Sequence, residues 1–260
     1  MTQPINRGPR EWDAEVYDAV SDPQFEWGME VLERTGLRGD ETVVDAGCGS
    51  GRITEQLIGR VPRGRVIAVD GSRGMIEKAR ERLGERVEYV VADLSGLEIE
   101  APVDLIFSTA TFHWIVDHDS LFRRLREVLT DGGRLVAQCG GEGNVAAYAA
   151  AIRRVMARPR FAPHFEGMEQ IWNFAGPEET ERRLRDAGFT EPRCWLEPKP
   201  VNPENPIEFA SVVTLGPHLA RLPEELQRPF VEAVVSESGT PLRLDYVRLN
   251  IEARASASSA

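Results

Sequence analysis

The stretch that decides the fold runs from Val43 to Arg52 and reads VVDAGCGSGR. An apolar run that ends in an acid enters three glycines at alternate positions, and a helical pattern begins at Ile53. A strand, a tight glycine turn and a helix in this order hold nucleotide-like cofactors in α/β folds. The dinucleotide fingerprint needs a glycine where this chain has Arg52, so the spacing points away from NAD and toward another adenosine-bearing cofactor.

Downstream of this turn, apolar runs continue to alternate with helical patterns. Such alternation is typical of parallel strands joined by right-handed crossovers. Two further strands are expected in the second half, separated by a long segment that we interpret as a helical insertion, because a structureless loop of that length is unusual in a compact domain. The expected strands cover residues 41–45, 65–69, 87–91, 103–107 and 134–138, followed by 189–196 and 242–251.

This pattern predicts a single domain over residues 1–252. The tail that follows, residues 253–260, is nearly all Ala and Ser and is predicted to be disordered. Within the domain we expect N-terminal helices at 11–36, a cofactor-binding core at 40–140, and insertions at 141–176 and 198–240 that cap the substrate side.

Composition limits the possible partners. The formal net charge is −11 over 260 residues, which argues against nucleic-acid binding. No apolar run approaches the roughly 20 residues of a membrane span, and the N-terminus has no apolar signal core, so we expect a cytoplasmic protein without a membrane partner. The three cysteines fit neither a disulfide framework nor a zinc site.

Acidic residues follow the first three expected strands. Asp45 closes the first strand, Asp70 the second, and Asp93 comes just after the third. The carboxyl ends of parallel strands form one crevice, and an acid about 20 residues after a glycine loop accepts hydrogen bonds from ribose hydroxyls. Asp70 as a helix N-cap is the alternative. Because no His or Cys joins these carboxylates at ligand spacing, we expect no metal site.

The combination of motifs resembles the class I S-adenosyl-L-methionine (SAM)-dependent methyltransferases. The resemblance rests on VVDAGCGSGRIT (43–54), VIAVDGS (66–72), VVADLSGL (90–97), DLIFSTATFHWIVD (104–117) and LTDGGRLVAQ (129–138). It implies a Rossmann-like, doubly wound, seven-stranded, mostly parallel sheet with an antiparallel last strand and helical insertions over the substrate side. It also implies that SAM is the cofactor and S-adenosyl-L-homocysteine the product.

The resemblance also implies roles for individual residues. Gly47 and Gly49 would lie against the methionine part of SAM, and Asp70 would bind the ribose. Asp45 would orient the loop or reach the ligand's amino group through water. The full set expected to contact the cofactor is Tyr17, Gln24, Asp45, Gly47, Gly49, Asp70, Gly71, Ser72, Met75, Ala92, Asp93, Leu94, Thr109 and Ala110.

The segment after the fourth strand, Thr109 to Trp114, would face the transferred methyl group. It is similar to the branch of the family that contains trans-aconitate methyltransferases, although those relatives commonly have Asn where this chain has Thr109. His113 is the candidate general base or substrate contact, and packing is its alternative role. The residues expected to contact the substrate are Thr111, His113, Trp114, Arg154 and Trp172.

These observations predict an enzyme that transfers a methyl group from SAM to a small molecule by in-line displacement. A carboxylate or another anionic metabolite would need no base because it is already ionised. Three alternatives stay open: a phenolic or isoprenoid acceptor with His113 as base, a non-catalytic SAM-binding module, and an NAD-dependent oxidoreductase. Both a monomer and a homodimer are compatible with the sequence.

Overall fold

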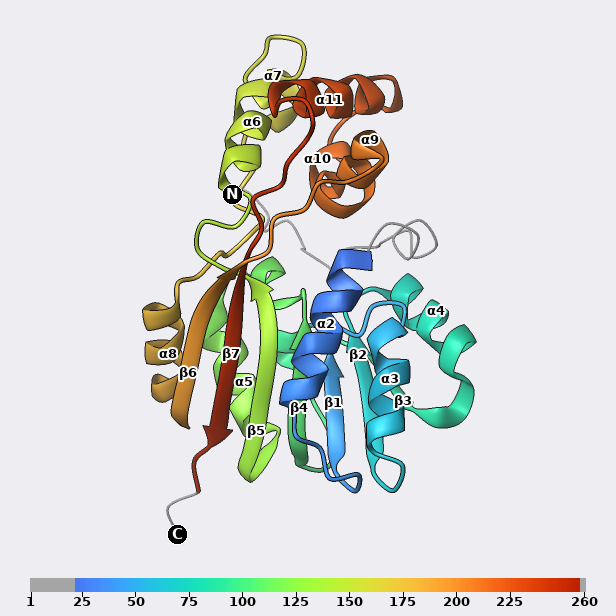
Figure 1. Cartoon of the computed structure of the whole chain (residues 1–260), viewed down its shortest axis with the longest axis vertical. Coiled ribbons are helices and arrows are strands. Elements are labelled where there is room, and N and C mark those ends of the chain that lie inside the picture. The colour runs from blue at the N-terminus through green and yellow to red at the C-terminus, as the bar shows by residue number, and fades with distance from the viewer. Residues whose placement is uncertain (1–21, 258–260) are drawn as a thin grey trace, which may run out of the picture.

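A computed structural model describes residues 22–257, which form a seven-stranded sheet with helices on both faces (Figure 1). The strand order is β3-β2-β1-β4-β5-β7-β6, and β7 runs antiparallel to both of its neighbours. The predicted fold class is therefore confirmed. The strands are β1 (Thr42–Ala46), β2 (Arg65–Asp70), β3 (Glu88–Val91), β4 (Val103–Thr109), β5 (Leu129–Gly140), β6 (Phe189–Pro198) and β7 (Val247–Ala255).

Helices cover both faces of the sheet because its strands are apolar on both sides. In β1, Val43 belongs to the same buried cluster as Leu32 and Leu57, whereas Val44 belongs to the cluster that contains Phe122. Successive side chains of a strand point to opposite faces, so an apolar run such as this needs cover on each. The covering helices are α2 (Asp22–Arg34), α3 (Arg52–Arg60) and α4 (Arg73–Leu83) on one face, and α5 (His118–Glu127) and α8 (Pro177–Asp186) on the other.

A second apolar core lies beyond the carboxyl ends of the parallel strands, at the top of Figure 1. Tyr148, Phe209 and Phe230 pack there, and Trp27 of α2 joins them. We call this layer the cap. Its helices are α6 (Ala146–Met156), α7 (Ala162–Phe165), α9 (Pro206–Phe209), α10 (Gly216–Leu219) and α11 (Glu224–Glu237), with a π-helical turn at Ala210–Thr214.

The end of the described chain differs from the prediction. Instead of a disordered tail from residue 253, β7 continues through Ala255, and Ala253 and Ala255 are buried. Ala253 pairs with Leu135 of β5, and Ala255 pairs with Phe189 of β6. A strand between two partners has backbone hydrogen bonds on both edges, which outweighs the low strand propensity of alanine. The same strand begins at Val247, later than the expected residue 242.

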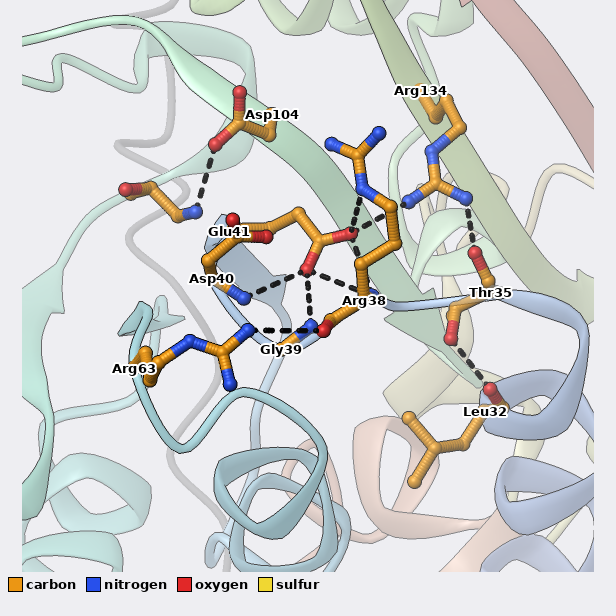
Figure 2. A network of polar contacts seen from close by, with 10 residues as sticks. Leu32, Thr35, Arg38, Gly39, Asp40, Glu41, Arg63, Asp104 and Arg134 are labelled. Carbon is orange, nitrogen blue, oxygen red and sulfur yellow. Dashed lines mark hydrogen bonds and ion pairs between the residues drawn. The ribbon is translucent and has the colours of Figure 1, made fainter.

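At the amino-terminal end of β1, opposite the cap, the carboxylate of Glu41 is buried in a network of polar contacts (Figure 2). Its oxygens accept the backbone N–H groups of Arg38 at 2.9 Å and Gly39 at 2.9 Å. The guanidinium of Arg134 lies 3.6 Å away and also donates to the Thr35 carbonyl. Burial pushes the pKa of Glu41 upward, but the backbone N–H groups outweigh burial and hold that pKa below its ordinary value.

Candidate active site

The glycine loop is tied to the neighbouring strand by backbone hydrogen bonds. The N–H groups of Gly47 and Cys48 both donate to the Val69 carbonyl, at 2.8 and 2.9 Å. Gly47 has φ +84°, and a Cβ atom there would overlap the Thr111 side chain. A Cβ at Gly49 would meet open space instead. The first glycine is therefore required by packing, whereas the second leaves room above the loop for a ligand.

Asp70 lies beside this loop at the carboxyl end of β2. Its Oδ2 accepts the Gly49 N–H at 3.0 Å, and its Oδ1 accepts the Ser72 N–H at 2.8 Å. The residue that caps α4 is Ser72, whose hydroxyl accepts the Met75 N–H at 3.2 Å, so Asp70 is not the cap. Because a carboxylate has several acceptor positions, the half-buried Asp70 can bind donors of a ligand as well as protein groups.

Asp93 stands at the end of the next strand. Its side chain is exposed and accepts the Ser95 N–H at 2.8 Å, which caps the short 3₁₀ turn Leu94–Gly96. Leu94 is buried beneath it, and the Ala92 N–H donates to the Asp70 carbonyl at 3.1 Å. The three strand-end acids therefore follow adjacent strands of the sheet, as the sequence predicted.

Asp45, the remaining strand-end acid, is only 1% exposed. The Thr54 hydroxyl donates to its Oδ2 at 2.7 Å. Burial raises the pKa of Asp45 to about 7; the Thr54 bond opposes the rise and the charge of Asp70 adds to it.

A cavity opens next to these loops, beneath the cap. It brings together residues distant in sequence, from α2, the end of β4, the cap and the start of β7. Five of the residues predicted for the site line it, namely Gln24, Ala110, His113, Trp114 and Trp172; the other lining residues are Asn144, Val145, Phe174, Val213, Thr214, Tyr246 and Arg248. Ala110 adopts φ +55°, a backbone conformation that costs free energy for a residue with a side chain.

His113 is buried, and its surroundings specify its protonation. The Gly140 N–H donates to Nδ1 at 3.3 Å, so Nδ1 carries a lone pair and not a proton. Burial, followed by the charges of Arg248 and His118, holds the pKa of His113 well below its ordinary value. The neutral ring therefore has its proton on Nε2. Neither nitrogen of this tautomer is placed to accept a proton from a substrate, which disfavours the role of general base.

Arg248 lines the cavity but was not among the site residues predicted from the sequence. Its side chain is 2% exposed, and it lines the cavity from the start of β7. The guanidinium lies 5.1 Å from the Trp27 ring centroid, and its Nε approaches the Gln138 Oε1 at 3.5 Å. Gln138 is in turn oriented by its donation to Asn250 Oδ1 at 2.9 Å. The one available signal was the alternation Arg248, Asn250, Glu252, which places polar side chains on a single face of a strand.

Two predicted substrate contacts need correction. The Thr111 hydroxyl donates to the Thr109 carbonyl at 2.9 Å, and its side chain packs over Gly47 without lining the cavity. Arg154 donates from Nε to Glu237 at 2.7 Å with a side chain that is 57% exposed. The acid on α11 attracts this arginine to the outer surface of the cap, away from the cavity. Tyr17, predicted to contact the cofactor, lies outside the described residues.

Gln24 places a buried hydrogen-bond acceptor at the cavity. Its Oε1 is buried, lines the cavity edge and has no hydrogen-bond partner among the described residues. A buried acceptor without a partner costs free energy unless a ligand or water donates to it. Together with the open space above Gly49 and the half-exposed Asp70, this acceptor fits a ligand that carries hydroxyl and ammonium donors, as SAM does.

Comparison with known proteins identifies the class. A family described as a methyltransferase domain matches residues 43–133. The trans-aconitate 2-methyltransferase of Methylobacterium nodulans is 33% identical over 186 residues, 72% of this chain and 67% of that protein. The enzyme of the same name from Azoarcus sp. is 40% identical over 127 residues, 49% of this chain and 50% of that protein. The chain thus spans two thirds of the first relative and half of the second.

A solved structure agrees at the level of the fold. The phosphoethanolamine N-methyltransferase 2 of Haemonchus contortus, bound to phosphomonomethylethanolamine and S-adenosylhomocysteine, superposes with a TM-score of 0.60. Its sequence is 20% identical, and the match covers 94% of this chain and 57% of that one. The chain belongs to the class I SAM-dependent methyltransferases, within the branch of trans-aconitate 2-methyltransferase relatives. The predicted enzyme class and the predicted cofactor, SAM, are confirmed.

Residues 22–257 also bear on membrane and metal partners. None of the helices in that range is both long and apolar enough to cross a bilayer. In the same range, no three His, Cys, Asp or Glu side chains gather into a group able to hold a metal ion. Cytoplasmic location and oligomeric state stay predictions.

Proposed function

We propose that this protein transfers the methyl group of SAM to a carboxylate oxygen of a small molecule held in the cavity beneath the cap. The observation that carries the proposal is the buried Arg248 guanidinium in a cavity that also reaches Ala110, at the cofactor edge of β4. A guanidinium pairs with a carboxylate through parallel hydrogen bonds, and burial strengthens that pairing.

The chain's own residues divide the work of holding SAM. Asp70 would accept hydrogen bonds from the ribose, Asp93 and Leu94 would meet the adenine, and the loop at Gly47 and Gly49 would face the methionine part. Gly71 would lie at the turn beside the ribose, with Ser72 and Met75 flanking the ribose and adenine. Gln24 would accept a hydrogen bond from the ligand, and Asp45 would orient the loop or reach the ligand's amino group through water. When bound, SAM supplies a methyl group made electrophilic by its sulfonium sulfur.

Methyl transfer to a carboxylate suits this cavity physically. For a carboxylate acceptor, an oxygen lone pair would form the new C–O bond, the electron pair of the C–S bond would return to sulfur, and no proton would be released. The sulfonium cation and the carboxylate anion would both be neutralised, so a dry cavity would favour this transfer over water. The protein aligns the reactants and excludes water, and it needs no general base.

His113 supports a carboxylate acceptor because it is not placed to act as a general base. A phenol or a carbon acceptor must lose a proton, and neutral His113 has its Nδ1 lone pair bonded to the Gly140 N–H. Its Nε2–H remains to donate to an acceptor oxygen. The relatives' name, trans-aconitate 2-methyltransferase, also denotes enzymes that act on a carboxylic acid.

The test combines cofactor binding with product analysis. Purified protein is titrated with S-adenosylhomocysteine by calorimetry, then incubated with SAM and a panel of carboxylic acids, phenols and isoprenoids. We expect binding and the formation of base-labile methyl esters. Binding without turnover of any acid would contradict the proposal, and turnover of phenols alone would point to the O-methylating alternative.

A matched pair of variants locates the anion site. Arg248→Met should lower kcat/KM for the best acid by about 100-fold while S-adenosylhomocysteine affinity is unchanged, because two charge-assisted hydrogen bonds contribute about 1.5 kcal/mol or more each. Arg243→Met removes an exposed arginine nearby and should leave kcat/KM unchanged. Equal effects of the two variants would exclude Arg248 as the anchor.

A further inference from the structure

Resting on the proposed function, we infer that the acceptor is a monoanion with a flat apolar body, an aryl or conjugated monocarboxylic acid, and not a tricarboxylate. The cavity presents one buried cation beside a wall of aromatic rings. The carboxylate lies at Arg248, and the body of the acid lies along the rings.

The aromatic wall consists of Trp114, Trp172, Phe174 and the ring of His113. Trp172 and Phe174 stack with centroids 5.5 Å apart and an interplanar angle of 19°. Phe174 stacks in turn on His113 at 5.8 Å, and Trp114 lies 6.0 Å from Trp172. Trp114, Trp172 and Phe174 are all half-buried, so each keeps surface that faces the cavity. Such rings bind flat, conjugated molecules through their faces and edges.

The Thr214 hydroxyl at the cavity is already bonded to protein. It shares a hydrogen bond of 2.9 Å with Tyr148 and donates to the Ala210 carbonyl at 3.1 Å. With Val145 and Val213 beside it, this part of the cavity offers a ligand mainly apolar contact.

The polar end of the cavity offers hydrogen-bond donors. Asn144 accepts the Val247 N–H through Oδ1 at 2.9 Å, which leaves its Nδ2 amide for a ligand. His113, through Nε2–H, and Arg248, through its guanidinium, add donor groups to the lining of the cavity. Carboxylate oxygens only accept hydrogen bonds, so the donors at this end match them.

The number of cationic side chains in the cavity limits how many carboxylates the acceptor can carry. Among the lining residues that the structure describes, Arg248 is the one that is ionised at neutral pH, since His113 is neutral and no Lys, Asp or Glu is present. A second and third carboxylate would lie against Trp172 and Phe174, where they would lose water without gaining a cation. The described cavity therefore disfavours trans-aconitate, the acid in the relatives' name.

The closing experiment compares two trans-unsaturated acids. Protein saturated with S-adenosylhomocysteine is titrated with trans-cinnamate and with trans-aconitate, and both are tested as acceptors with SAM. We expect trans-cinnamate to bind at least tenfold more tightly and to have the higher kcat/KM. Tighter or equal binding of trans-aconitate would overturn the inference. If trans-cinnamate bound but was not methylated, the inference about which acid the cavity recognises would hold, and the proposed methyl transfer would be contradicted.

Ring variants test the wall itself. Trp172→Leu should weaken trans-cinnamate binding about tenfold, Trp172→Phe should largely retain it, and S-adenosylhomocysteine affinity should be unaffected in both. Trp195→Leu, which changes a half-buried tryptophan on β6 outside the cavity, is the matched control. If Trp172→Leu and Trp195→Leu had equal effects on binding, the aromatic wall would not be the recognition surface.

Discussion

The two ends of β1 each bury a carboxylate, and they treat it in opposite ways. Glu41, just before the strand, is 3% exposed; burial acts to raise its pKa, but the backbone N–H groups around it outweigh burial and lower that pKa. Asp45, near the other end, is 1% exposed, and the pKa rises to about 7 because the Thr54 hydroxyl does not compensate for burial and the nearby Asp70 is also acidic.

The contrast between Glu41 and Asp45 distinguishes the end of the sheet that stabilises the fold from the end that faces the candidate site. At the amino end the buried Glu41 carboxylate accepts backbone N–H groups of Arg38 and Gly39 and lies beside the Arg134 guanidinium, so this carboxylate has partners within the protein (Figure 2). At the carboxyl end the loops leave Asp45 incompletely compensated for its burial, Asp70 half-exposed, and the Gln24 Oε1 without a hydrogen-bond partner among residues 22–257. Incomplete compensation costs free energy, and a ligand that brings donors and positive charge can recover it.

The largest expected effect tests whether Asp45 lowers stability. A folded-state pKa of about 7 against 3.8 corresponds to about 4 kcal/mol. Because the folded pKa is raised, stability is greatest below pH 4 and is lost as pH rises through 7. In Asp45→Asn, the Thr54 hydroxyl can accept from the new amide, and this loss should disappear. Urea unfolding of both proteins between pH 4 and pH 8 measures it; parallel curves would remove the contrast with Glu41.

Next in size is the loss of cofactor binding in Asp70→Ala. Two charge-assisted hydrogen bonds to ribose hydroxyls are worth about 3 kcal/mol, which is a roughly hundredfold lower affinity for S-adenosylhomocysteine. Asp104→Ala is the control from the opposite edge, where Asp104 accepts the Thr42 N–H at 2.9 Å. It should reduce thermal stability and spare affinity. Calorimetry that found both variants equally weakened would erase the distinction between the edges.

Glu41→Gln should cost about 2 kcal/mol of unfolding free energy at pH 7, because hydrogen bonds to a charged acceptor are replaced by weaker ones. The folded pKa of Glu41 is lowered, so its contribution is present above the unfolded value of about 4.3 and is lost as pH falls through the folded value. Chemical denaturation at pH 7 and at pH 3 measures the change. A difference between wild type and variant that grows on acidification would contradict this sign.

The smallest effect is expected for Arg154→Ala. Its exposed ion pair with Glu237 lies on the cap surface, so kcat/KM should stay within about twofold of wild type and stability within about 0.5 kcal/mol. Steady-state kinetics with the preferred acid measures this. A tenfold loss would mean that the cap surface takes part in substrate binding.

Much of the cofactor half could be predicted because its signals are local. The strand, the glycines and the following acid lie within thirty residues from Val43 to Asp70, and the geometry of a strand–turn–helix unit places them together without reference to the rest of the chain. The prediction of a disordered tail from residue 253 was wrong because the signal for a strand there is not local. Ala253 and Ala255 carry no local strand signal, and only their position between β5 and β6 makes them a strand.

The residues that line the acceptor cavity could not all be predicted from the sequence, because only tertiary contacts bring them together. Gln24, Ala110, Asn144 and Arg248 lie on separate elements and line one cavity. Arg154 and Arg248 are the same residue type, yet Glu237 attracts the first to the surface while Trp27 and Gln138 accompany the second inside. Composition cannot distinguish two such arginines, because burial and partners come from the packing of the whole chain.

The sequence by itself determined the α/β class and the order of strand-end acids, since backbone geometry and periodicity express these within short stretches, and the resemblance of its motifs to a known family supplied the cofactor. Only the tertiary structure decided that His113 is a neutral donor, because the Gly140 N–H occupies Nδ1. It also decided that Arg248 is the cation of the cavity and that Asp45 titrates near pH 7. Protonation and charge recognition depend on solvation, and solvation is known only once every neighbouring group is in place.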